Sequence, residues 1–276
     1  LKQFVFSSNY NSKNEKYSLR THYVSQNLEN RENGGLTNAS ILNFESEDNL
    51  FSERSKLSVK FENATNYFLN KRYFFDQNIL LFKLKNSNTF SLGHVFEYET
   101  MYNSFEQAEP TDYYGSSSIS ISDKTELKTI SNTLYTNLKS KFFGNIMVSY
   151  LNYNYNYKTN ALSTNYKGFK ENENLLSFSL KKSIFNHKIS GKFSKNLFGT
   201  RIGDLINFKL DSNNYSNFNY SIGLDIISKH PGFNFELFDS AYNDIGWDKE
   251  LNLLKIKNLF LKLNSNSFGL LSLDIV

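Results

Sequence analysis

The sequence contains no cysteine and only two prolines among its 276 residues. The lack of cysteine excludes disulfide bonds, thiol catalysis and cysteine-ligated zinc. Scarce proline suits long, uninterrupted β-strands, because proline has no N–H group to donate to a strand ladder.

Long apolar runs and an excess of one charge are also missing. No apolar run approaches the roughly 20 residues of a transmembrane helix, which excludes a helical membrane protein. The 31 Lys and Arg residues stand against 27 Asp and Glu residues, which leaves a net charge of only +4. Since no run of Lys and Arg resembles a nucleic-acid surface, we expect no nucleic-acid partner.

The sequence shows no motif for catalysis or for metal binding. A glycine-rich phosphate loop and a Gly-x-Ser-x-Gly elbow are absent, and no histidine pairs with another histidine or with acids at metal-ligand spacing. Glu97 and Glu99 share a strand face as a carboxylate pair would, but no Ser/His or Asp/His arrangement accompanies them, so solvated charges are the favoured interpretation. We therefore expect no enzyme, no cofactor and no metal.

Aromatic residues are abundant in a sequence that is nevertheless hydrophilic. The chain has 18 Tyr and 26 Phe residues, yet its mean hydropathy is −0.51. This combination is unusual for a soluble globule. It is expected when apolar side chains face lipid and polar side chains face a wet interior.

Residues 88–102 show the pattern that repeats along the chain. Even-numbered positions carry Phe90, Leu92, Phe96 and Tyr98, whereas odd-numbered positions are mainly small or acidic. Successive strand residues point to opposite faces, so the segment has one apolar and one polar face. It is long enough to cross a bilayer, which takes roughly 9–11 tilted residues.

Further strand candidates follow the same period and bring the total to about 12–14. They are 2–8, 16–24, 57–69, 73–84, 126–140, 146–157, 175–185, 188–197, 200–210, 217–227, 250–263 and 268–276. In 146–157 the apolar face changes phase near Tyr150, which predicts a β-bulge there. A short strand is also considered at 40–44. Long polar loops are expected at 26–55, 103–123, 158–174 and 229–248.

These strands predict one domain, residues 1–276, that is an antiparallel transmembrane β-barrel with short turns and long loops. An open sheet of such strands would leave exposed edges that invite aggregation. Closure removes the edges and satisfies every backbone group, as a bilayer core demands. The sequence starts and stops inside strand-like patterns, so we expect the chain to be incomplete at both ends and the barrel to be larger than its visible strands. A soluble β-sandwich, such as a secreted adhesin, is the alternative.

Two short segments resemble a known family. Residues 17–36 contain a strand followed by a polar loop with Asn33-Gly34-Gly35, and residues 230–247 run from Pro231 to Trp247. Both are similar, in this order, to segments of the putative porin family of Bacteroidota. The resemblance implies a bacterial outer-membrane location, with outer-membrane lipid as the surroundings.

The polar strand faces predict the residues that line the lumen. They are Arg20, His22, Glu97, Glu99, Lys181, Lys192, Arg201, Lys209 and Asp225. Because charges of both signs are present, the sequence predicts weak ion selectivity. Tyr153, Tyr155 and Tyr157 are interpreted as an aromatic girdle at one membrane interface, with a carbohydrate-stacking platform as the alternative.

Two functions of different classes fit this interpretation. The first is a pore for passive diffusion of small solutes. The second is a non-conducting barrel subunit of a larger outer-membrane assembly for secretion, nutrient uptake or barrel insertion, with other outer-membrane proteins or lipoproteins as partners. In that case the long loops would plug the lumen or bind the partners.

Overall fold

The structure is a computed structural model that describes residues 1–46, 57–83, 88–115, 120–161, 167–212, 218–265 and 269–275. Side chains are described throughout these ranges except at 43–46, 161, 218, 265 and 270–275. Among the described residues, no helix has the length and apolar character needed to cross a membrane.

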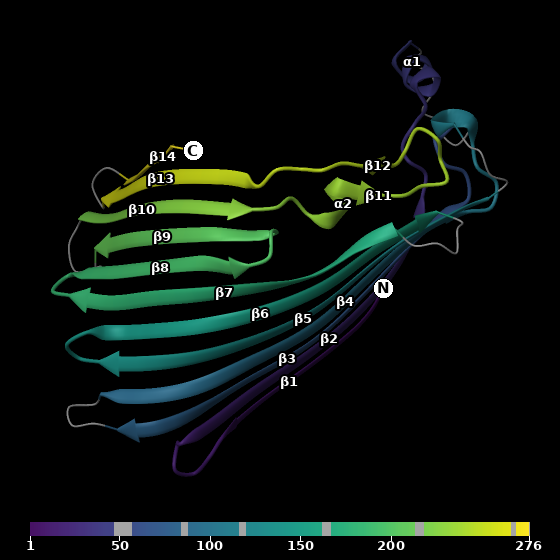
Figure 1. The fold of residues 1–276 in the computed structure, drawn as a ribbon. Helices are drawn as coiled ribbons and strands as arrows, with labels where there is room; N and C mark the ends of the chain where they lie inside the picture. The colour runs from purple at the N-terminus through teal and green to yellow at the C-terminus, as the bar shows by residue number, and fades with distance from the viewer. Residues whose placement is uncertain are drawn as a thin grey trace.

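The described residues form one 12-stranded antiparallel sheet in which every strand pairs with its neighbours in sequence, so the strands meander up and down (Figure 1). A second sheet of two short strands, β11 (Leu237–Phe238) and β12 (Trp247–Asp248), lies in the segment between β10 and β13. The strands of the large sheet are β1 (Lys2–Asn11), β2 (Tyr17–Glu32), β3 (Ala64–Lys83), β4 (Thr89–Gln107), β5 (Ile121–Ser140), β6 (Gly144–Ala161), β7 (Lys167–Ile184), β8 (His187–Phe198), β9 (Ile202–Ser212), β10 (Phe218–Lys229), β13 (Leu254–Ser265) and β14 (Gly269–Ile275).

The strands differ in length, and this divides the sheet into two parts. Strands β3 to β7 have 18 to 20 residues, whereas β8 to β10 have 11 or 12. The longer strands continue past the ends of β8 to β10 toward the long loops (Figure 1). We call these continuations the strand extensions; they comprise residues 64–71, 100–107, 121–128, 152–161 and 167–174. We call the remainder of the sheet, next to the short turns, the apolar band.

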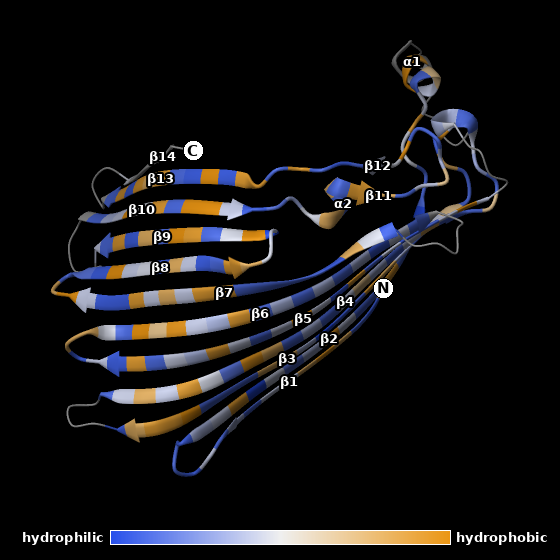
Figure 2. Cartoon of the chain, in the orientation of Figure 1, coloured by the Kyte–Doolittle hydropathy of each residue, from blue (hydrophilic) through white to orange (hydrophobic). Residues whose placement is uncertain are grey.

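One face of the apolar band is hydrophobic and open. Phe178, Phe193 and Ile206 lie side by side on β7, β8 and β9, and 45%, 46% and 40% of their surfaces are exposed. Hydrophobic and hydrophilic residues alternate along these strands (Figure 2), as the twofold period of a strand requires when its two faces meet different surroundings. We call the hydrophobic face the outer face and the opposite one the inner face.

The segment between β10 and β13 folds back over the inner face of the extensions. This inner segment, residues 230–248, contains α2 (Phe233–Glu236), β11 and β12. Its Tyr242 and Ala241 form a buried core with Ile121 at the start of β5, and Phe61, Phe105 and Tyr114 pack around them. This buried core of the described residues therefore lies beside the long loops.

The sequence-based prediction of an antiparallel all-β chain is confirmed, but several boundaries are wrong. The candidates at 57–69 and 73–84 are one strand, β3, and residues 40–44 belong to the helix α1 (Asn38–Ser46). The loops at 103–123 and 158–174 are shorter than predicted, because β4, β5, β6 and β7 all extend into these ranges. Residues 116–119 and 162–166 lie outside the described residues. The predicted bulge near Tyr150 is also wrong, since β6 pairs in unbroken register with both neighbours across that position.

Candidate pore-lining face

Strand register places the predicted lumen residues of the large sheet on one face. Side chains of directly opposed residues share a face, and Arg20 opposes Asp76, Glu97 opposes Ser131, and Asp225 opposes Asn207. Following these pairs across the sheet brings eight of the nine predicted residues to the inner face: Arg20, His22, Glu97, Glu99, Lys181, Lys192, Lys209 and Asp225. The inner face of the apolar band therefore carries most of the predicted charged residues, with a few apolar side chains such as Phe74 and Val95 among them.

Charges on the β2–β4 side of this face are matched in pairs. Arg20 forms an ion pair with Asp76, whose carboxylate also accepts a hydrogen bond from the Tyr135 hydroxyl at 3.0 Å. Arg72, which sequence reasoning missed, forms an ion pair with Glu97. The pairing occupies the carboxylates, and the described residues contain no group of three or more His, Asp or Glu side chains that could hold a metal ion.

Glu99 and His22 also have polar partners on this face. The amide of Asn70 donates a hydrogen bond to Glu99 at 3.2 Å, and the Nδ1 atom of His22 lies 2.7 Å from the Ser7 hydroxyl. Neither contact joins a carboxylate to a histidine.

Arg201 is the exception among the predicted lumen residues, and it is buried. Its guanidinium forms an ion pair with Glu236 of α2, and only 10% and 4% of the two side chains are exposed. The guanidinium carbon lies 4.6 Å from the ring centres of Phe169 and Phe233. Arg201 was predicted to face the lumen because it alternates with apolar neighbours, but the inner segment covers it.

The loop that carries Arg201 is held by a buried carboxylate. Glu173 of β7 is fully buried and accepts hydrogen bonds from the backbone N–H groups of Thr200 and Arg201 at 3.0 and 2.8 Å. The neighbouring Gly199 has a φ of +103°, and a Cβ there would stand 2.3 Å from the Glu173 carboxyl carbon. This role of Glu173 was not predicted, since the residue lies within the predicted loop 158–174.

The predicted aromatic girdle is wrong for this protein. Tyr155 and Tyr157 lie on the inner face and are 2% and 4% exposed, and the Tyr157 hydroxyl donates a hydrogen bond to the Leu237 carbonyl at 2.8 Å. Phe233 of the inner segment packs 4.9 and 5.4 Å from their ring centres. Tyr153 follows the same face, with its ring centre 5.9 Å from that of Tyr155. Because Tyr155 and Tyr157 are buried under the inner segment, these two side chains meet neither lipid nor a sugar, which also removes the stacking alternative for them.

Further hydrogen bonds fix the inner segment to the extensions. The carboxylate of Asp123 accepts hydrogen bonds from the Ser240 hydroxyl and from the Ala241 N–H at 2.9 Å. The Tyr242 hydroxyl donates to the side chain of Gln107, and burial raises the pKa of this hydroxyl above its usual value. The inner segment is therefore an integral part of the inner wall and not a loose loop.

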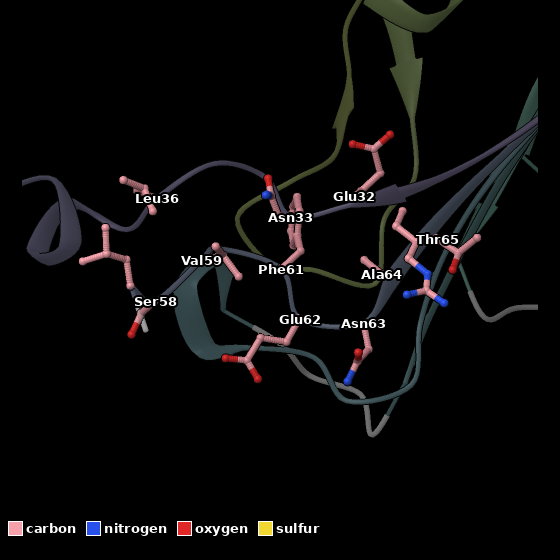
Figure 3. A pocket seen from close by; sticks show the side chains of 12 residues that line it. Glu32, Asn33, Leu36, Ser58, Val59, Phe61, Glu62, Asn63, Ala64 and Thr65 are labelled. Atoms are coloured by element: carbon pink, nitrogen blue, oxygen red, sulfur yellow. The ribbon is translucent and has the colours of Figure 1, made fainter. Parts of the chain in front are cut away.

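The Asn33-Gly34-Gly35 turn contributes to a large hollow beside the long loops. The hollow measures about 890 Å³ and is lined by residues of the β2–β3 connection, including Asn33, Phe61 and Glu62 (Figure 3). Gly34 has a φ of +65°, and a Cβ there would meet the Phe61 ring at 2.5 Å. The Phe61 N–H donates to the Asn33 carbonyl at 2.9 Å. The glycine thus lets the turn close over Phe61, which belongs to the core around Tyr242.

Comparison with known proteins gives one result. A family model described as "Putative porin" matches residues 1–275. No curated protein matches the chain. The resemblance read from residues 17–36 and 230–247 thus agrees with a match over nearly the whole sequence.

Proposed function

The chain belongs to the Putative porin family, and from this premise we propose that it forms a pore for passive diffusion of small solutes. Family and fold together assign it to the bacterial outer membrane as a porin-like protein of the transmembrane β-barrel class. A channel, and not an enzyme, is the activity that the family indicates. In the proposal, residues 1–276 act as one barrel domain whose lumen is lined by the inner face.

The single observation that supports a pore is the opposite polarity of the two faces within the apolar band. On β6 and β7, Ser149 opposes Ser177 on the inner face, while the adjacent Val148 opposes Phe178 on the outer face. The Ser177 hydroxyl lies 2.8 Å from that of Ser194, which continues the polar row onto β8. Lipid outside and water inside is the arrangement that such alternation serves in outer-membrane barrels.

Orientation follows from the two ends of the sheet. Outer-membrane barrels place short turns on the periplasmic side and long loops on the extracellular side. We therefore assign the strand extensions, the inner segment and the hollow of Figure 3 to the extracellular side. The turn-side end of the inner face then opens toward the periplasm.

The test uses the absence of native cysteine. Ser149→Cys and Val148→Cys are adjacent in β6 and point to opposite faces. The protein is reconstituted into planar bilayers and treated with a charged, membrane-impermeant thiol reagent. A pore predicts stepwise conductance that the reagent reduces for Ser149→Cys and leaves unchanged for Val148→Cys.

The second candidate is a non-conducting barrel subunit, and the inner segment favours it. This segment covers the inner face of the extensions, where a plug would lie. That function predicts no conductance from correctly folded protein, together with stoichiometric partners that co-purify from the outer membrane. Folding is checked by gel migration before and after boiling, because folded barrels resist detergent until heated.

A further inference from the structure

The β7–β13 side of the inner face carries more lysines than carboxylates near the short turns. Register places Lys188 opposite Ser183 and Asp211, and Asp211 opposite Ser221, which in turn opposes Lys262. In the next row, Ser190 lies between Lys181 and Lys209, and Lys192 lies two positions further along β8. We call these five residues the lysine patch: Lys181, Lys188, Lys192, Lys209 and Lys262.

Acidic residues offset only part of the charge of the lysine patch. Among the residues whose side chains the structure describes, the carboxylates on the same part of the inner face are Asp211 and Asp225. Strand register adds Asp274 of β14, which opposes Phe260 of β13 in the row of Lys209. Asp211 forms an ion pair with Lys209 at 2.8 Å, and Asp225 accepts a hydrogen bond from Asn207. Five lysines against three aspartates leave an excess of positive charge, in contrast to the β2–β4 side, where Arg20 and Arg72 each have a carboxylate.

Two hollows lie within the lysine patch. One measures about 320 Å³ and is lined in part by Lys181, Lys188 and Lys209. The other measures about 310 Å³ and is lined in part by Lys188, Lys262 and Tyr220. They share Lys188 and Asp211, so the two hollows adjoin one another. The hydroxyls of Ser183, Ser190 and Ser221 stand among the ammonium groups as further donors.

We propose that the lysine patch is a binding site for small anions with phosphate or carboxylate groups at the periplasmic end of the lumen, and that it makes the pore prefer anionic solutes. The proposal rests on the proposed pore function and names its solute class. Clefts lined by charge of one sign raise the local concentration of the opposite ion. The proposal replaces the weak ion selectivity expected from charge counts, because the structure separates the paired charges of the β2–β4 side from the excess of lysines on the β7–β13 side.

The first measurement is the reversal potential of the reconstituted protein in a KCl gradient. The unmodified protein is expected to prefer chloride. Neutralising three lysines together in Lys188→Gln/Lys209→Gln/Lys262→Gln removes that preference. Asp211→Asn frees Lys209 and changes the reversal potential in the opposite direction. The matched control, Lys71→Gln/Lys124→Gln/Lys170→Gln, removes three lysines from the outer face of the extensions and leaves the preference unchanged.

The second measurement does not need conduction. Inorganic phosphate is titrated into the detergent-solubilised protein, and calorimetry gives its affinity. The triple patch variant is expected to weaken phosphate binding by about tenfold or more, which is the lower end of the effect that charged clefts have on local ion concentration. Boiled and unboiled gel migration confirms that each variant is folded.

The outcomes separate this inference from the pore itself. Conduction with equal reversal potentials in all variants, and phosphate affinity that the triple patch variant does not lower, contradicts the anion site and leaves the pore intact. Folded protein that binds phosphate through the patch but never conducts supports the site and contradicts the pore.

Discussion

On β6 and β7, the apolar band and the strand extensions place their hydrophobic side chains on opposite faces of the same strand. On β6 in the band, Val148 and Tyr150 lie on the outer face and are 41% and 40% exposed. Further along the same strand, Tyr155 and Tyr157 lie on the inner face and are buried, whereas the outer face carries Asn154 in an unbroken register. The register of β6 is continuous, so the two parts of the strand differ in what surrounds each face and not in which way the side chains point.

The two parts therefore satisfy the hydrophobic effect in different ways. In the band, an apolar outer face suits lipid and a polar inner face suits water. In the extensions of β6 and β7, the outer face is polar and the inner face is covered by the inner segment, so the aromatic side chains Tyr155, Tyr157 and Phe169 lie inside. Burial against protein there replaces contact with lipid. The two regions should consequently respond in opposite ways to the same kind of substitution.

The largest difference between the two regions is expected in the free-energy cost of removing a cation from the inner face. Arg201→Ala leaves Glu236 buried with His230 as its remaining partner, at 2.6 Å. Removing one partner of a buried ion pair costs about 3–5 kcal/mol, so the inner segment should detach from the extensions. Its detachment is measured as the rate of proteolytic cleavage between residues 230 and 248 under native conditions.

The matched control for Arg201→Ala is Arg72→Ala in the band. Arg72 is paired with Glu97, but 48% of its side chain is exposed. An exposed pair contributes about 0–1 kcal/mol, so the cleavage rate should stay near that of the unmodified protein. Equal rates in the two variants would contradict the placement of Arg201 under the inner segment.

The next largest difference between the two regions is expected in the stability cost of adding a charge to the outer face. Val148→Arg places a guanidinium on the lipid-facing surface, where such a substitution costs about 2–4 kcal/mol near the bilayer midplane. Asn154→Arg lies on the same face of the same strand but in an extension, where a surface substitution changes stability by about 0.5 kcal/mol or less. Urea unfolding of the protein in lipid vesicles measures both. If Asn154→Arg were as costly as Val148→Arg, the extension would lie in lipid and the boundary between the two regions would be wrong.

The band is the part that the sequence could predict. Alternation identifies a strand when one face is apolar and the other polar, which holds for residues 88–102 and 175–185 in their lipid-facing portions. In the extensions the outer face is polar and much of the inner face is polar too, so the segments at 158–174 resemble loops. Because the two faces of these segments differ little in polarity, alternation does not identify them as strands, and β6 and β7 are therefore longer than predicted.

The site was predictable only as far as local pattern determines it. Eight of the predicted residues share the inner face because alternation determines the face. Arg201, Tyr155 and Tyr157 were misplaced because Phe233 and Leu237 of the inner segment cover them, and Leu237 lies 80 residues from Tyr157 in the sequence. The lysine patch was invisible as a cluster, since Lys188 and Lys262 become neighbours only through strand pairing.

The smallest difference is expected for the tyrosine hydroxyls, and it tests the girdle directly. Tyr157→Phe leaves the buried Leu237 carbonyl without its donor, and an unsatisfied buried polar group costs about 1–3 kcal/mol. Tyr150→Phe removes a hydrogen bond of 2.6 Å to Asn174 that is exposed, so its effect should stay within about 0.5 kcal/mol. The loss of stability in each variant is measured by urea unfolding and by hydrogen exchange of the backbone around Leu237. In an interfacial girdle the two tyrosines would be equivalent, so equal losses of stability in the two variants would support the girdle. Faster hydrogen exchange near Leu237 in Tyr157→Phe alone would show that Tyr157 holds the inner segment against the wall.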